Sequence, residues 1–144
     1  MTTRQPAAPG GLLHIRAVDR TTGEILWERN RPNLIVNSGR ARMATAGAAF
    51  ITHAAAGTSA LIPTPDDVGP LTDQLLVALD SVSTPSDRQR VFVFTIPGDE
   101  MPGLTASEFG LFTSDSILCA RWVDVPGWPM RAGVDLIGNW HVTF

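Results

Sequence analysis

The residues of this sequence that could carry out chemistry are one cysteine, three histidines and a few carboxylates, and they are widely spaced. Lysine is absent, so a phosphate-binding loop of the Gly-x-x-x-x-Gly-Lys type cannot form. A Gly-x-Ser-x-Gly nucleophile elbow is absent as well. His14, His53 and His141 fall in three different predicted strands, whereas a metal site needs a local pair or carboxylate partners. We therefore predict no metal site and no cofactor.

The remaining reactive groups favour structural roles. Cys119 lies in an apolar run, which is typical of a small buried core residue, and no basic cluster flanks it to favour a thiolate. Asp66 and Asp67 lie in a proline-rich segment where carboxylates are usually solvated, and a calcium site would need more oxygen ligands than this segment offers. Glu108 interrupts a strand-like segment, so it should find a hydrogen-bonding partner. We predict that the protein is not an enzyme; a small hydrolase using Glu108 or Asp67 is the enzymatic alternative.

Composition indicates one small globular domain. The chain has 144 residues, a formal net charge of −3, 44% hydrophobic and 17% charged residues, which excludes a wholly disordered chain. No run approaches the ~20 apolar residues of a membrane span. The acidic balance argues against nucleic-acid binding. Residues 1–10 lack the apolar core of a signal peptide and are expected to form a flexible N-terminal arm, followed by a single domain over 11–144. Synthesis in the cytoplasm is therefore expected.

The first structured unit is predicted to be a β-hairpin. Leu13, Ile15 and Ala17 alternate with polar residues, the period-2 pattern of a half-buried strand. A turn follows over 19–23, and the return strand over 24–29 is expected to end before Pro32, because proline cannot donate a ladder hydrogen bond.

One helix is predicted over 39–49. Asn37 and Ser38 are good N-cap residues, and the stretch behind them is rich in alanine and arginine. Arg40 and Arg42 would face solvent or a partner.

The rest of the chain is mostly extended. The segment 58–70 holds three prolines and is predicted to be a long loop, and 71–80 is ambiguous between a short helix and a strand. Further strands are predicted over 51–58, 81–85, 90–96, 104–112, 117–123 and 134–144. The pattern predicts a mainly β fold: an antiparallel β-sandwich with one short α-helix inserted after the first strands.

The order of several short motifs resembles tail-fibre and baseplate attachment proteins of tailed bacteriophages, of the tail-collar-fibre type. The motifs are the hairpin over 15–24, Asn-Leu-Ile-Val-Asn-Ser-Gly-Arg over 33–40, the segment 51–58 with its prolines behind it, Glu-Phe-Gly-Leu-Phe over 108–112, Cys-Ala-Arg over 119–121, and the closing Trp-His-Val-Thr-Phe over 140–144. Together they cover most of residues 11–144 in the order found in that family.

The resemblance implies a structural virion protein, assembled in the host cytoplasm and located in the tail. Large fibres continue into a long shaft beyond this domain, so a connector or attachment subunit for tail fibres or the tail tip is favoured. Its partners would be other tail, baseplate or fibre chains, and it would form a homo-oligomer, a trimer or a hexamer. The alternative is a receptor-binding module that recognises a carbohydrate on the host surface.

The candidate interface residues are those that a monomer would gain from covering. They are Trp128, Pro129, Met130, Arg40, Arg42, Pro65, Asp66 and Asp67. Trp128 stands between prolines, so either it forms a rigid contact for a partner or it folds back over the core of its own chain.

Overall fold

The computed structural model describes residues 10–46 and 51–143, and this part of the chain is mainly β. Within it, nine strands, one short helix and a 3₁₀ turn at Gly98–Glu100 follow one another. The strands and the helix are β1 (Gly10–Asp19), β2 (Ile25–Ile35), α1 (Asn37–Ala46), β3 (Ile51–Gly57), β4 (Leu75–Ala78), β5 (Ser81–Ser86), β6 (Gln89–Ile96), β7 (Thr105–Thr113), β8 (Leu118–Pro129) and β9 (Val134–Thr143).

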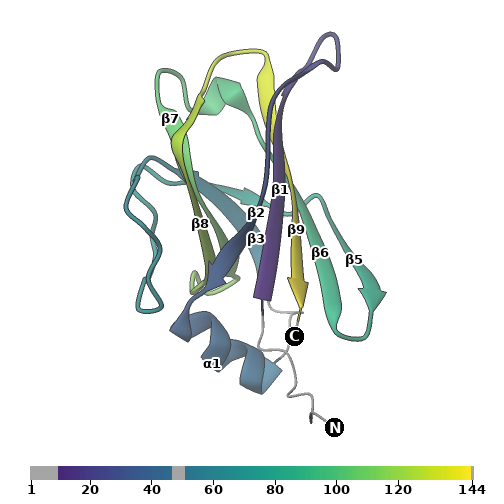
Figure 1. Cartoon of the computed structure of the whole chain (residues 1–144), viewed down its shortest axis with the longest axis vertical. Coiled ribbons are helices and arrows are strands. Elements are labelled where there is room, and N and C mark those ends of the chain that lie inside the picture. Colours follow the sequence, from purple (N-terminus) through teal and green to yellow (C-terminus); the bar gives the residue numbers. More distant parts are fainter. Residues whose placement is uncertain (1–9, 47–50, 144) are drawn as a thin grey trace, which may run out of the picture.

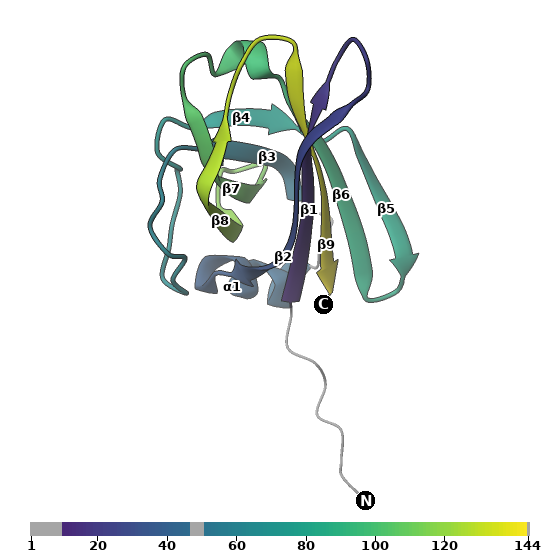
Figure 2. The ribbon, with the colours of Figure 1, turned by 45° about the horizontal axis from the view of Figure 1, so that its top comes forward.

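The strands form one antiparallel sheet in the order β4-β3-β7-β8-β2-β1-β9-β6-β5. The sheet is curled into a half-barrel, and α1 lies at one end of it (Figures 1 and 2). The chain passes from β4 to β5 through Leu79 and Asp80, whose amides donate to Thr52 O on β3 (3.2 Å) and Val93 O on β6 (2.7 Å). This crossing brings the two outermost strands of the sheet together.

A single large core fills the half-barrel. Alternate residues of β1 and β9 point inward, and Leu13, Ile15, Ala17, Leu136 and Trp140 are fully buried. They pack in one cluster with inward residues of β6, β7 and β8. The period-2 patterns of the first and last strands therefore mark the core correctly.

The mainly β, antiparallel fold and the helix inserted after the first two strands are confirmed, whereas two separate sheets are not. The hydrogen-bonded ladder is continuous, because β2 pairs with β1 along its length and with β8 at Leu34 and Ile35. The strand predicted over 81–85 is confirmed as β5, and the sheet has nine strands in the described residues. The ambiguous segment 71–80 contains a strand rather than a helix.

Two predicted element boundaries were wrong. β2 does not end before Pro32 but continues to Ile35, and Pro32 pairs with Leu12 of β1. Proline is tolerated there because the ladder to β8 starts only at Leu34, beyond Pro32. The helix begins at Asn37 instead of residue 39 and is described as far as Ala46; the predicted positions 47–49 lie outside the described residues.

Candidate functional site

The feature of the fold that stands out is the loop over Thr58–Gln74, which joins β3 to β4 and which we call the 58–74 loop. Its two ends are tied together by a hydrogen bond from the Thr58 amide to Thr72 O, 3.0 Å long. Leu71 is buried in a small cluster with Val36, Ala55, Phe112 and Leu118, separate from the main core. The loop is thus packed against the outer side of the half-barrel.

A buried ion pair fastens the loop. Arg121 of β8 donates from Nε to Glu108 Oε2 of β7 (3.0 Å), and its Nη2 lies 2.9 Å from the same oxygen. The other carboxylate oxygen, Glu108 Oε1, accepts the loop amides of Ser59 (3.2 Å) and Thr72 (2.7 Å). The two side chains are 7% and 2% exposed. The prediction that Glu108 finds a structural partner is confirmed.

The sequence makes room for this carboxylate with a glycine. Gly57 faces Glu108 across the β3–β7 ladder, and a Cβ atom at Gly57 would collide with the Glu108 side chain and with Leu71. Any larger residue at position 57 would therefore displace the group that holds both ends of the loop.

Asp67 extends the network into the middle of the loop. Its Oδ2 accepts a hydrogen bond from Arg121 Nη1 (3.0 Å), and the Thr64 amide and hydroxyl also donate to its carboxylate (2.9 and 2.7 Å). Burial raises the pKa of Asp67, but the bonds from Thr64 and the charge of Arg121 outweigh it, so the pKa lies below its ordinary value of 3.8. Asp67 is therefore a structural member of the network.

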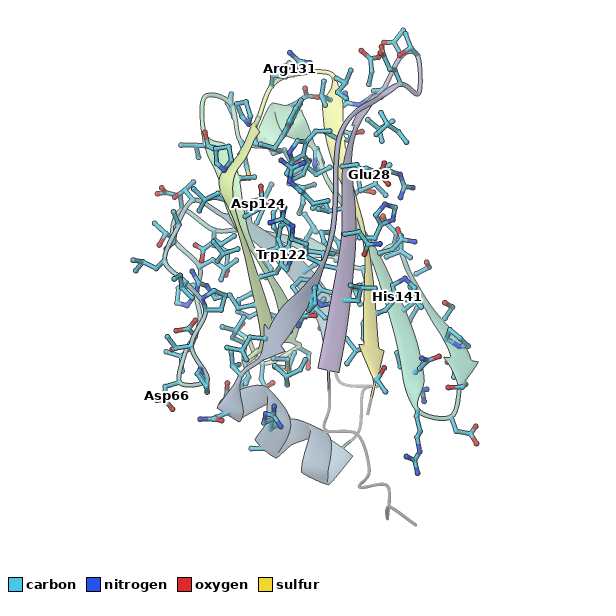
Figure 3. All side chains as sticks on the ribbon, viewed as in Figure 1. Glu28, Asp66, Trp122, Asp124, Arg131 and His141 are labelled. Atoms are coloured by element: carbon cyan, nitrogen blue, oxygen red, sulfur yellow. The ribbon has the colours of Figure 1, made fainter. Side chains whose placement is uncertain are left out.

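The tip of the loop is attached to the helix. The Asn37 amide at the start of α1 donates to Pro65 O (2.7 Å), and Asn37 Nδ2 donates to Asp66 Oδ1 (2.9 Å). Figure 3 shows Asp66 at the lower end of the loop, close to α1. Pro65 and Asp66 thus remain on the surface while their positions are fixed.

This fixed loop exposes three large aliphatic side chains. Leu61, Ile62 and Val68 are 77%, 83% and 72% exposed. Together with Asp67, Glu108 and Arg121 they line an open cavity of about 570 Å³. Exposed apolar side chains on a fixed backbone are typical of a contact surface, because ordering them costs little further entropy.

The remaining candidate interface residues lie elsewhere. Arg40 is exposed on α1, and Arg42 is bound to Asp115 (2.7 Å). Pro129 is exposed, but Met130 is only 4% exposed and belongs to the core of its own chain.

Trp128 is partly buried. It packs against Trp27 with ring centroids 5.9 Å apart, and both rings contact the main core. This is the arrangement expected if Trp128 folds back over its own chain. The structure does not bring Trp128 into the cavity of the 58–74 loop, whose lining comes from that loop and from Glu108 and Arg121.

The sequence reasoning missed the apolar loop residues and the Arg121 partnership. Leu-Ile-Pro over 61–63 and Val68 are apolar residues within a proline-rich loop, and this signal was available. The pairing of Glu108 with Arg121 depends on the register of β7 and β8, where Gly110 is opposite Arg121 and Glu108 is opposite Val123.

The other reactive groups lie apart from the loop. Among the described residues, no three His, Cys, Asp or Glu side chains cluster closely enough to hold a metal ion. His14 is hydrogen-bonded to Glu28, and His141 is exposed on β9. Cys119 is fully buried, as predicted, and burial raises the pKa of its thiol to about 12.

Acid should loosen the loop. Because the pKa of Asp67 is lowered in the folded chain, its carboxylate stabilises the closed loop above about pH 4, and this contribution is lost as the pH falls through the lowered pKa. We expect the protection of loop amides against hydrogen exchange, corrected for intrinsic rates, to fall between about pH 5 and pH 2.

The matched variants separate this effect from general acid sensitivity. Asp67→Asn should show weaker protection already at neutral pH and a smaller acid response, while Asp87→Asn, at an exposed site outside the loop, should behave like the wild type. Loop protection in the wild type that stays constant down to pH 2 would contradict this role of Asp67.

Comparisons of the chain with protein-family models, curated proteins and solved structures gave no match. Within residues 10–46 and 51–143, no helix has the length and apolar character needed to cross a lipid bilayer.

Proposed function

We propose that this chain is a structural subunit that attaches other chains through its 58–74 loop. The observation that carries the proposal is the exposure of Leu61, Ile62 and Val68 on a backbone held by the buried Arg121–Glu108–Asp67 network. A monomer gains nothing from exposing three aliphatic side chains on a well-fixed loop, whereas a partner can bury them at small entropic cost.

The sequence resemblance gives this subunit a place: the tail or baseplate of a tailed bacteriophage, as a connector or attachment subunit for fibres or the tail tip. A homo-oligomer, a trimer or a hexamer, and a location in the virion tail follow from the same resemblance.

Co-expression with the products of the flanking genes tests the proposal. We expect those genes to encode tail or baseplate proteins and the tagged wild-type chain to capture at least one of them. Changing Leu61→Asp and Ile62→Asp together should weaken that capture about 30-fold or more, since it removes apolar contacts at the centre of the surface.

The control is Val82→Asp on β5, which places an aspartate at an exposed aliphatic residue outside the loop, 52% accessible. Val82→Asp should capture partners as the wild type does. Equal capture by both variants, or no capture of any flanking product by the wild type, would contradict the proposal.

A carbohydrate-binding module is the second candidate, and the cavity of about 570 Å³ beside the loop is the observation that favours it. This volume lies within the range of small-molecule sites. Reproducible binding of purified protein to defined sugars on a glycan array, abolished by the Leu61→Asp and Ile62→Asp changes, would move the assignment to receptor binding.

A further inference from the structure

The 58–74 loop lies in an acidic stretch of the sequence. Residues 51–87 contain five aspartates, at positions 66, 67, 73, 80 and 87, and no arginine or lysine. Within the loop Asp67 is bound by Arg121, whereas Asp66 and Asp73 are exposed and bonded to the uncharged Asn37 and Thr58. The loop that exposes the aliphatic residues therefore also presents the negative charges of Asp66 and Asp73, and this surface suits a partner that is both apolar and basic.

A surface of that chemistry exists on the same chain. It consists of Trp27, Arg29, Arg31, Trp128 and Arg131, with the carboxylate of Asp124 beside Arg29 and Arg31, and we call it the Arg–Trp cluster. Three arginines and one aspartate give the cluster a formal charge of +2 (3 − 1).

The cluster is ordered by stacking. The Arg29 guanidinium lies 5.0 Å from the Trp27 ring, Trp27 lies 5.9 Å from Trp128, and the Arg131 guanidinium lies 5.4 Å from the Trp128 ring. Cation–π contacts of this kind hold the arginines in place before any partner arrives.

The buried carboxylate of Asp124 holds two of the arginines in place. Its side chain is 1% exposed, accepts a bond from Arg29 Nε (3.3 Å) and lies 3.7 Å from Arg31 Nη1. The Arg31 side chain remains 62% exposed. Figure 3 shows Asp124 and Arg131 on and beyond β8, well away from Asp66 on the loop.

We propose that the partner of the 58–74 loop is the Arg–Trp cluster of a second copy of this chain. The proposal rests on the proposed function, because it takes the loop as the docking surface and names what covers it. Tryptophan and arginine are the residues most enriched at the energetic centres of interfaces, and the opposite charges of the two surfaces would steer and align the copies.

The contact is head-to-tail. The two surfaces differ and lie at different places on the molecule, so each copy can use its loop toward one neighbour and its cluster toward another. Repetition of such a contact gives a closed ring or an open chain of copies, in contrast to a symmetric dimer that pairs one surface with itself.

Two complementary variants test this arrangement by sedimentation over a range of concentrations. The loop variant carries Leu61→Asp and Ile62→Asp, and the cluster variant carries Arg31→Glu and Arg131→Glu. We expect the wild type to self-associate and each variant alone to do so about 30-fold more weakly. An equimolar mixture of the two variants should form a one-to-one dimer and nothing larger, because it retains one intact loop and one intact cluster.

Controls separate lost contacts from lost folding. Val82→Asp and Arg88→Glu make single substitutions of the same two kinds at exposed sites outside both surfaces and should associate as the wild type does. Arg31→Glu places a second carboxylate near buried Asp124, so the single Arg131→Glu variant is measured beside it, since Arg131 contacts Trp128. Denaturation midpoints of all variants show which remain folded.

Each remaining outcome overturns the proposal in a recognisable way. If the wild type stays monomeric, the loop does not bind a second copy. If the loop variant nevertheless loses capture of the flanking gene products, the loop binds another chain. If the cluster variant self-associates as strongly as the wild type while the loop variant does not, the loop of one copy contacts the loop of the other and not the cluster. The proposed function fails separately, in the co-expression experiment, if the wild-type chain captures no product of a flanking gene.

Discussion

Replacing Arg121 with methionine is expected to destabilise the folded chain by about 3–5 kcal/mol, because it leaves the carboxylate of Glu108 buried without its positive partner. The Glu108 side chain is 2% exposed, so in the folded chain its charge is compensated by the guanidinium and not by bulk water. Domains of this size are stable by about 5–15 kcal/mol, so the loss is a large part of the total. Urea denaturation measures it directly.

The same change should release the 58–74 loop. Arg121 bonds Asp67 in the loop and holds Glu108, which in turn accepts the amides of Ser59 and Thr72. Thermolysin, which cleaves before aliphatic residues, should therefore cut the Arg121→Met protein in this loop much faster than the wild type. Arg40→Met, at an exposed position on α1, serves as the control and should change neither quantity.

A double variant tests whether the loss of stability comes from the uncompensated charge of Glu108. Glu108→Gln retains an oxygen that can accept the two loop amides but carries no charge, so Arg121→Met with Glu108→Gln should lose less stability than the sum of the two single changes. If the urea midpoint of the Arg121→Met variant equals that of the wild type, the buried Arg121–Glu108 pair does not stabilise the fold, and the proposed role of this pair is contradicted.

Trp140→Ala is the second large effect, with an expected loss of about 3–5 kcal/mol. Trp140 is fully buried on β9, which pairs with β1 on one side and β6 on the other. Its Nε1 also donates to Asn33 Oδ1 of β2 (2.9 Å), so the ring joins three strands of the sheet. Removal leaves a cavity that the surrounding strands cannot close.

The neighbouring residue gives a matched control for Trp140. His141 is exposed on the opposite face of the same strand, and His141→Ala should stay within about 0.5 kcal/mol of the wild type. Similar losses from both changes would mean that β9 does not have the register described here.

The sequence is most informative where a strand has one buried face. The alternation in β1 and β9 identifies Leu13, Ile15 and Trp140 as core residues, because a period of two matches the strand geometry. It is least informative for β4, a four-residue strand in the segment 71–80, whose pattern was ambiguous between a helix and a strand. The closure of the two sheet edges through Leu79 and Asp80 is a long-range contact that local periodicity does not contain.

The candidate site was only partly predictable for the same reason. The length and proline content of 58–70 mark the loop, and Glu108 was predicted to need a partner, whereas Asp67 was expected to be solvated and is instead bonded to Arg121. Their convergence on Arg121 depends on the pairing of β7 with β8 and on the path of a loop that crosses them, which single-sequence patterns do not give. Met130 shows where reasoning from residue type fails. It was predicted to lie at an interface because it is apolar and close to prolines, but it is buried in the core of its own chain.

A photo-reactive amino acid placed at position 61 tests most directly whether the loop is the attachment surface. In particles or complexes assembled from this chain and the products of its flanking genes, irradiation should cross-link position 61 to another structural chain or to a second copy. The same group at position 82, which is also exposed on the surface, should give no cross-link to those chains. Incorporation of the chain with cross-links from position 82 and none from position 61 would contradict the assignment of the 58–74 loop as the docking surface.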